Sequence, residues 1–130
     1  MSQRKDMPHE RLQEFVVIDY SKEMVILAVI PKGEQELIVG IGQYSIIEPT
    51  NTADVAFAVR DEYHNRGIGT ELLRYLANLA KRQGLGGLYA EVLLENKPML
   101  RVFEKMGLTM QRTVNSGVYE LRMTFRGNLE

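Results

Sequence analysis

The segment from His64 to Leu73 constrains this chain most, because it joins an apolar, strand-like run to a run with helical periodicity. The apolar run before it extends from Asp54 to Val59. Gly67 and Gly69 lie at the junction, where the absence of Cβ atoms lets a ligand approach the backbone. The unpaired N–H groups and the positive dipole end of the helix point into the same space. The segment predicts an anion-binding turn, although a tight bend alone would also favour glycines here.

Two kinds of nucleotide-binding loop are excluded by the residues that follow these glycines. A nucleoside-triphosphate loop requires Lys and then Ser or Thr after its last glycine, whereas Thr70 and Glu71 follow Gly69. The dinucleotide fingerprint requires a third small residue at the position of Leu72. A phosphate or pyrophosphate of another ligand is therefore the predicted occupant, with Arg66 placed to add a charged contact.

The same segment resembles the acyl-CoA pyrophosphate loop of the GCN5-related N-acetyltransferases (GNAT). The pattern of that loop is Gln or Arg, two further residues, Gly, one residue, and Gly or Ala. Arg66-Gly67-Ile68-Gly69 fits it, with His64 where Gln or Arg is usual. A second match, Asn96 to Leu108, resembles the later motif of the family: an Asn, a short helix and a closing glycine. The resemblance covers roughly Val25 to Phe125. Within the family, the sequence resembles bacterial protein-lysine acetyltransferase domains most.

The resemblance implies an α/β (α+β) fold of the GNAT type in a single domain, residues 1–130. Its sheet is expected to be mixed and mostly antiparallel, with about six strands and flanking helices. The sheet is expected to splay between the fourth and fifth strands of the family, here Asp54 to Val59 and Leu88 to Leu94. The opening between these two strands is expected to hold the pantetheine arm of acyl-CoA.

Hydrophobic periodicity predicts a helix, three strands, a helix, a strand, a helix and two strands. The first helix is expected from Pro8 to Val16, because proline favours the first turn. The other two helices are expected from Gly67 to Gln83, with Gly84 as the C-cap, and from Lys97 to Met106, with Asn96 as the N-cap and Gly107 as the stop. Five of the six strands have expected bounds: Glu23 to Ile30, Leu37 to Ile47, Asp54 to Val59, Leu88 to Leu94 and Val118 to Phe125.

The start of the chain departs from the family pattern. The family fold normally has a strand and a helix before the segment that matches Pro8 to Val16, whereas this chain has only a few polar residues there. That strand and helix are expected to be missing, so that the native polypeptide is longer or a partner subunit, for example in a homodimer, covers the strand edge. Because the missing portion often contributes to the acceptor site in the family, the acceptor is the least determined part of the site.

The resemblance implies acetyl-CoA as the co-substrate, held by the loop and by strand backbone. Two of the implied residues have an alternative role in the fold. Asn96 either bonds a pantetheine amide or caps the following helix. Phe103 either packs on the pantetheine arm or belongs to the core with its helix neighbours. The implied binding residues are Phe57, Ala58, Val59, His64, Asn65, Arg66, Gly67, Ile68, Gly69, Thr70, Asn96, Met99 and Phe103.

The implied reaction is direct attack of a primary amine on the acetyl-CoA thioester in a ternary complex, with a protein lysine as the favoured acceptor. A lysine amine with a pKa of about 10.4 needs a base or a dry site at neutral pH. Family members commonly place a glutamate on the strand before the loop, where this chain has Asp54, on one strand face with Ala56 and Ala58. Glu91 on the next strand is the second candidate, acting through a water. For both Asp54 and Glu91, the alternative is an ordinary acidic side chain in contact with solvent.

Two other functions remain open for the same pocket. Many members that acetylate small amines carry a tyrosine where this chain has Phe103, and protein-lysine acetyltransferases often lack it, since a thiol with a pKa of about 8.5 leaves readily as the thiolate. Acetylation of a small amine is therefore the less favoured alternative. A non-catalytic, acyl-CoA-sensing regulatory module is the other, because Asp54 replaces the usual glutamate and the acceptor side is incomplete.

Composition excludes several further classes of protein. A net charge of −1 over 130 residues gives no field to attract nucleic acid or a membrane surface. The chain has no cysteine, which excludes disulfides and thiolate chemistry, and its two histidines, His9 and His64, lie too far apart to suggest a metal site. The longest apolar run, Met24 to Ile30, is too short to span a bilayer, and the polar start lacks a signal-peptide core. A cytoplasmic protein is expected.

Overall fold

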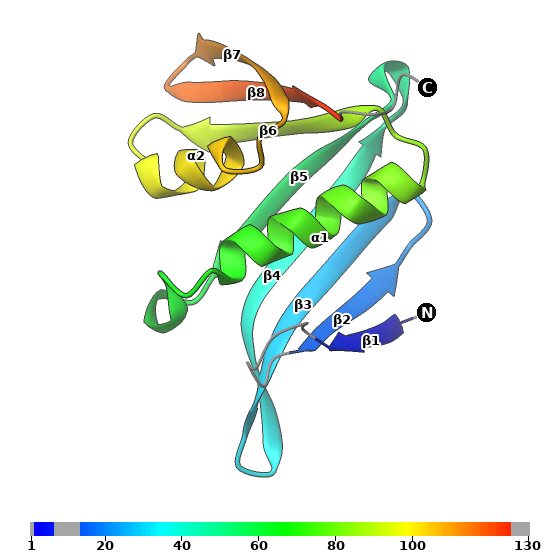
Figure 1. The fold of residues 1–130 in the computed structure, drawn as a ribbon, viewed down its shortest axis with the longest axis vertical. Helices are drawn as coiled ribbons and strands as arrows, with labels where there is room; N and C mark the ends of the chain where they lie inside the picture. The colour runs from blue at the N-terminus through cyan, green and yellow to red at the C-terminus, as the bar shows by residue number, and fades with distance from the viewer. Residues whose placement is uncertain (1, 7–13, 126–130) are drawn as a thin grey trace.

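The computed structural model describes residues 2–6 and 14–125 of the chain. Within these residues, eight strands form one sheet in the order β1-β2-β3-β4-β5-β6-β8-β7. Figure 1 shows α1 crossing in front of the strands β3 to β5, while α2 lies beside β6. The elements are β1 Ser2–Asp6, β2 Glu14–Asp19, β3 Glu23–Lys32, β4 Gln35–Ile47, η1 Glu48–Thr50, β5 Thr52–Val59, η2 Asp61–Tyr63, α1 Ile68–Arg82, β6 Gly87–Leu93, α2 Lys97–Glu104, β7 Thr109–Asn115 and β8 Val118–Thr124.

The sheet is antiparallel at every neighbouring pair except β5 and β6, which run parallel. Helix α1 connects these two strands, because parallel neighbours need a crossover connection. Their pairing extends only from Thr52 opposite Gly87 to Asp54 opposite Tyr89. This arrangement confirms the predicted mixed, mostly antiparallel sheet that splays between these two strands.

Helix α1 packs unusually close to β4 because two glycines of that strand present no side chain to it. A Cβ atom at Gly40 would lie 3.0 Å from Leu72 Cδ1, and one at Gly42 would lie 3.0 Å from Leu76 Cδ1. Both leucines are fully buried. The apolar stripe of α1 therefore reaches the sheet itself, as its helical periodicity predicts.

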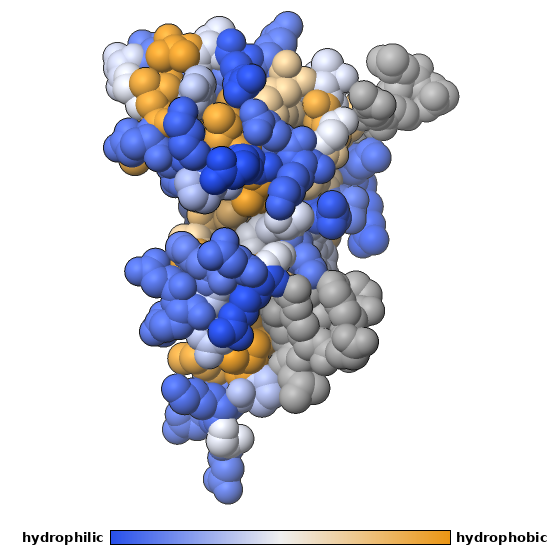
Figure 2. All heavy atoms as spheres, turned by 60° about the vertical axis from the view of Figure 1, so that its left-hand side comes forward, coloured by the Kyte–Doolittle hydropathy of each residue, from blue (hydrophilic) through white to orange (hydrophobic). Residues whose placement is uncertain are grey.

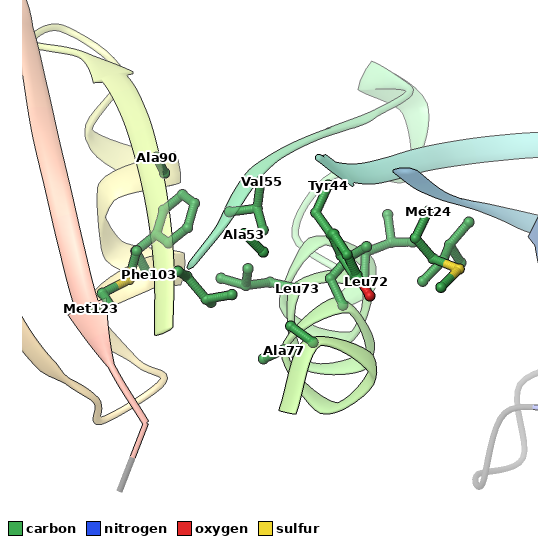
Figure 3. Close-up of a cluster of buried hydrophobic side chains, with 14 of the residues drawn as sticks. Met24, Tyr44, Ala53, Val55, Leu72, Leu73, Ala77, Ala90, Phe103 and Met123 are labelled. Atoms are coloured by element: carbon green, nitrogen blue, oxygen red, sulfur yellow. The ribbon is translucent and has the colours of Figure 1, made fainter. Parts of the chain in front are cut away.

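One hydrophobic core joins the two halves of the sheet. In Figure 3 the labelled side chains run as a layer from Met123 and Phe103, past Ala53 and Leu73, to Tyr44. These five residues come from α1, α2, β4, β5 and β8 and are at most 2% exposed. The strands that part beyond Asp54 are thus held together at their base by shared apolar packing.

The predicted helix from Pro8 to Val16 is wrong for its last residues, and 8–13 lie outside the described residues. Glu14–Asp19 forms the strand β2, in which Phe15 pairs with Ala28 and Val17 pairs with Ile26. Burial decides the outcome, because Phe15 and Val17 both enter the core on the same strand face. The strand β1 at Ser2–Asp6 was also not predicted, and it pairs with β2 along the edge of the sheet.

The remaining predicted elements are confirmed, with ends that differ by a few residues. Strand β4 begins at Gln35, two residues earlier than predicted, because its pairing with β3 extends up to the tight turn, where Lys32 pairs with Gln35. Helix α2 ends at Glu104 rather than Met106, before Gly107 with its φ of 71°. No helix in the described part of the chain is long and apolar enough to cross a membrane.

Figure 2 brings the left-hand side of Figure 1 forward. The surface narrows there between an upper and a lower block, and pale and hydrophobic atoms show at this waist among more hydrophilic neighbours. In Figure 1 this is the side on which the ends of β5 and β6 diverge. Figure 2 therefore presents the side of the molecule on which β5 and β6 part.

Candidate active site

The candidate site begins where β5 and β6 separate. Beyond Asp54, β5 remains paired with β4 as far as Val59, but it has no pairing with β6. On its other side β6 stays paired with β8 along its whole length. The inner edges of both strands are thus left without a strand partner, and such groups bind polar ligands or water.

The N-terminus of α1 lies at the far end of β5. Its N-cap is Gly67, with a φ of 82°, and this residue makes no side-chain cap to the first turn. Asn65 also has a positive φ, 62°. Such backbone angles favour glycine and asparagine, so the sequence of the loop matches the path that it follows. The N–H groups at the start of this 15-residue helix receive no side-chain cap from Gly67 and are therefore suited to contact an anion.

Two side chains of the loop have roles that the sequence pattern did not show. The His64 Nε2 atom lies 2.8 Å from the Val59 carbonyl oxygen, so this ring ties the loop back to the end of β5. The Arg66 guanidinium lies over the Tyr63 ring, 5.0 Å from its centroid. Arg66 is exposed at the start of α1, where its charge adds to the helix dipole. The backbone of Val59 was predicted to contact acetyl-CoA, but its carbonyl oxygen already has His64 as a partner.

Phe57 links the loop to α2 across the opening. A Cβ atom at Gly69 would lie 3.1 Å from Phe57 Cε2, so the small residue at 69 leaves room for this ring. On its other side the Phe57 ring lies 5.7 Å from the ring of Phe103, centroid to centroid. Phe103 is 1% exposed and therefore belongs to the core, one of its two predicted roles. The pair of rings forms the apolar floor between β5 and α2.

Asn96 and Met99 belong to the start of α2, the helix that lies beside β6 in Figure 1. The Asn96 Oδ1 atom accepts a hydrogen bond from the Met99 backbone N–H at 3.3 Å, so Asn96 caps α2. Met99 is half-buried against the core. Capping is thus one of the two roles predicted for Asn96, and its contact with a pantetheine amide stays a prediction.

The two candidate bases lie on the sheet face opposite α1. Strand alternation places Asp54, Ala56 and Ala58 together there, while Ala53 and Val55 face the core. Glu91 on β6 comes to the same face, and its charge acts on Asp54. Partial burial and then the Glu91 charge raise the pKa of the Asp54 carboxyl above its ordinary value of 3.8. A raised carboxyl pKa makes a better base at neutral pH.

Tyr89 is a site residue that the sequence analysis missed. It stands opposite Asp54 in the last paired position before the strands part. Its hydroxyl donates a hydrogen bond to Glu91 Oε2 at 2.9 Å. Burial, followed by this hydrogen bond, raises the pKa of Tyr89 to about 12, so the hydroxyl keeps its proton. The available signal was the two-residue spacing to Glu91, which puts both side chains on one strand face.

The described residues contain no cluster of three or more His, Asp or Glu side chains able to hold a metal ion. The titratable groups at the opening are the carboxylates of Asp54 and Glu91 and the hydroxyl of Tyr89, which do not form a set of metal ligands. The arrangement can bind an anion at one end of β5 and accept a proton at the other. These are the requirements for transfer from an activated thioester to an amine.

Comparison with known proteins agrees with this geometry. Residues 2–108 match the model of the acetyltransferase (GNAT) family. The chain is 26% identical over 101 residues to the acetyltransferase PA5475 of Pseudomonas aeruginosa, covering 78% of this chain and 54% of that protein. It is 37% identical over 60 residues to the acetyltransferase Pat of Mycolicibacterium smegmatis, covering 46% of this chain and 18% of that protein.

Among solved structures, the GNAT domain of S. lividans PAT superimposes with a TM-score of 0.70 at 28% identity. The match covers 83% of this chain and 64% of that domain. The chain therefore spans about half of one curated relative and less than a fifth of the other. The superposition shows that the chain has the same overall fold as that domain.

Proposed function

Because this chain belongs to the GNAT family of acetyltransferases, we propose that it transfers an acetyl group from acetyl-CoA to a primary amine, within a single domain of residues 1–130. The observation that carries the proposal is the separation of β5 from β6 directly after Asp54, with the uncapped start of α1 at the other end of β5. One strand edge thus connects a proton acceptor to an anion site.

Acetyl-CoA supplies the activated acetyl group, and the residues of the loop fit its pyrophosphate. The N–H groups of Ile68, Gly69 and Thr70 lie in the first turn of α1, and Gly67 lets the ligand reach them without meeting a Cβ atom. Asn65 and Arg66 complete the loop, with the guanidinium as the charged partner. The strand edge from Phe57 through Ala58 to Val59 offers backbone groups for the amides of pantetheine, with the exception of the Val59 carbonyl, which His64 contacts.

Asp54 is the proposed general base. The amine nitrogen attacks the thioester carbonyl, a C–N bond forms, the C–S bond breaks, and the leaving thiolate takes up a proton from solvent, to which Asp54 returns the proton of the amine. The proton lost by the amine passes to the Asp54 carboxylate, whose raised pKa suits it to this task. Ala56 and Ala58 beside it leave space on the same face for the acceptor. Glu91 is the alternative base, acting through a water.

A protein lysine is the proposed acceptor. Two similar proteins are named as Pat acetyltransferases, one of M. smegmatis and one of S. lividans. The buried Phe103 occupies the position at which small-amine members of the family carry a tyrosine. The carboxylates of Asp54 and Glu91 at the opening also favour a cationic acceptor over an anionic one.

Calorimetry tests whether the loop binds the pyrophosphate. CoA and acetyl-CoA are titrated into the full chain, and pantetheine, which lacks the pyrophosphate and the nucleotide, is titrated as the control. We expect CoA to bind at least about 100-fold more tightly than pantetheine, since charge-assisted contacts and helix N–H groups are lost with the phosphates. Equal affinities would contradict a phosphate-binding loop.

Turnover distinguishes an enzyme from an acyl-CoA sensor. Release of free thiol from acetyl-CoA is followed with poly-L-lysine, with a lysine-containing peptide and with spermidine. We expect thiol release with the lysine polymers to exceed that with spermidine. Binding of acetyl-CoA without thiol release from any acceptor would favour the regulatory module, and a preference for spermidine would favour a small amine.

A further inference from the structure

A row of polar side chains crosses the sheet face opposite α1 and ends at the opening. The Thr113 hydroxyl of β7 donates to Glu120 Oε1 of β8 at 3.2 Å. The Arg122 Nη1 atom lies 3.8 Å from the same oxygen, and its guanidinium lies 5.3 Å from the centroid of the Tyr89 ring. The Tyr89 hydroxyl in turn donates to Glu91. Arg122 therefore restrains the Tyr89 ring, and the Tyr89 hydroxyl restrains Glu91, whose own register partner on β8 is Glu120.

Register places this end directly beside Asp54. Tyr89 pairs with Asp54 of β5 on one side and with Arg122 of β8 on the other. Glu91 lies two residues further along β6, on the same face. Glu91 is thus flanked by two carboxylates, Asp54 of β5 and its register partner Glu120 of β8, and their repulsion would turn an unrestrained Glu91 side chain toward solvent. The hydrogen bond from Tyr89 is the contact that opposes this movement.

We infer that Tyr89 is a positioning residue, whose hydroxyl holds the Glu91 carboxylate beside Asp54 at the point where β5 and β6 part. This inference rests on the proposed function, in which Asp54 is the base. It assigns different tasks to the two carboxylates: Asp54 takes the proton, and Glu91 supplies a fixed negative charge. That charge keeps Asp54 basic and attracts a cationic acceptor.

The charged and titratable groups around Asp54 make the sign of the effect clear. Glu91 and Tyr89 face it from β6, and Glu120 and Arg122 follow on β8, while its partner on β4 is the uncharged Ser45. Glu91 is the charge that raises the pKa of Asp54. Removing the Tyr89 hydroxyl frees Glu91, so the pKa of Asp54 is expected to fall toward its ordinary value.

A carboxyl titration by carbon-13 NMR tests the inference on the full chain, without substrate. Tyr89→Phe is expected to lower the pKa of Asp54 by about half a unit to one unit, and Glu91→Gln by at least as much. Adding Tyr89→Phe to Glu91→Gln should produce no further change, because Tyr89 acts through Glu91. Tyr119→Phe, on the opposite face of β8, is the matched control and should leave the pKa of Asp54 unchanged.

Two results of this titration would overturn the inference. One is an unchanged pKa of Asp54 in a folded Tyr89→Phe variant. The other is an equal fall of this pKa with and without the Glu91 carboxylate, which would show that Tyr89 acts on Asp54 by another route. Circular dichroism of each variant separates both results from a loss of fold.

Turnover with poly-L-lysine provides the second readout. In Tyr89→Phe the acid limb of kcat/KM is expected to move to lower pH together with the pKa of Asp54, and kcat at neutral pH to fall about 3- to 10-fold. KM for acetyl-CoA should stay unchanged. A lower kcat without a shift in the acid limb of kcat/KM would show that Tyr89 has only a structural role. If no variant transfers acetyl groups, the proposed function fails, and the NMR titration still decides the inference.

Discussion

At the scale of single residues, Asp54 connects function to stability through its raised pKa. Burial and Glu91 raise this pKa above 3.8, so the folded protein binds the proton more tightly than the unfolded chain does. The associated stability is fully present below pH 3.8, the ordinary carboxyl pKa, and is lost as the pH rises through the folded-state value. At neutral pH the ionised Asp54 therefore lowers the free energy of unfolding.

Replacing Asp54 by Asn is expected to raise the melting temperature at neutral pH, because Asn has the shape of the protonated acid but no charge. The gain should shrink as the pH falls toward 4 and disappear below it. Differential scanning calorimetry at several pH values measures this. Glu95→Gln, at an exposed carboxyl outside the site, is the control. A gain that is the same at every pH would show that charge is not its cause.

The same variant is expected to lose activity. Without a base, turnover at neutral pH should fall about 100- to 10,000-fold, with the affinity for acetyl-CoA little changed. Asp54→Glu keeps a carboxylate and should retain activity. Normal turnover by Asp54→Asn together with inactive Glu91→Gln would assign the base to Glu91. If both variants are unimpaired, positioning alone accounts for the rate.

At the scale of elements, the two helices begin in different ways. Helix α2 starts at Asn96, whose side chain accepts a hydrogen bond from its first turn. Helix α1 starts at Gly67, which has no side chain to offer. A capped helix start has already satisfied a donor that an anion needs, whereas an uncapped start has not. Of the two α-helices in the described part of the chain, we therefore expect α1 rather than α2 to receive a phosphate at its first turn.

Gly67→Ala tests this difference, with Gly84→Ala as a matched control. Gly67 and Gly84 flank the two ends of α1 and have similar φ angles, 82° and 86°. Each alanine should cost about 1–2 kcal/mol of stability, because both positions require a left-handed backbone. Only Gly67→Ala should also weaken CoA binding, by at least about tenfold. Calorimetric titration and chemical denaturation of both variants measure the two effects, and an equal loss of affinity would leave the loop without a special role.

At the scale of the whole molecule, the opening exists because the sheet is held at its base and free at its end. The shared core around Ala53 and Leu73 joins the two halves, and pairing between β5 and β6 stops at Asp54. A ligand that contacts β5, the start of α1 and the β6 side together would connect parts that no strand pairing joins. Such binding stabilises the folded state by mass action.

Acetyl-CoA is therefore expected to raise the melting temperature of the whole domain. At 100 times its dissociation constant, a ligand adds about 2.7 kcal/mol, which for a chain of this size corresponds to roughly 5–12 °C. Thermal melts with acetyl-CoA, with pantetheine and without ligand measure the shift. Pantetheine should have a much smaller effect, and Gly67→Ala should reduce the shift with acetyl-CoA. A shift of equal size in that variant would place the ligand elsewhere.

Local features of the chain were predictable from sequence. The loop and both helices were predicted because their signals, Gly67, Asn96 and the apolar spacing of α1, act within a few residues. The parting of β5 and β6 was expected through a family resemblance rather than from spacing. The helix expected at Pro8 to Val16 was wrong over its last residues, because short apolar runs are compatible with either element until burial selects one.

The amino-acid sequence by itself determined where the chain turns, which helix starts lack a cap, and which strand faces are apolar, since these depend on neighbouring residues and on the intrinsic preferences of each side chain. Only the tertiary structure decided that pairing between β5 and β6 ends at Asp54, and that Tyr89, Glu91 and Asp54 meet there. Asp54 is far from the other two in the chain, and the register that joins them depends on the packing of the whole sheet against α1.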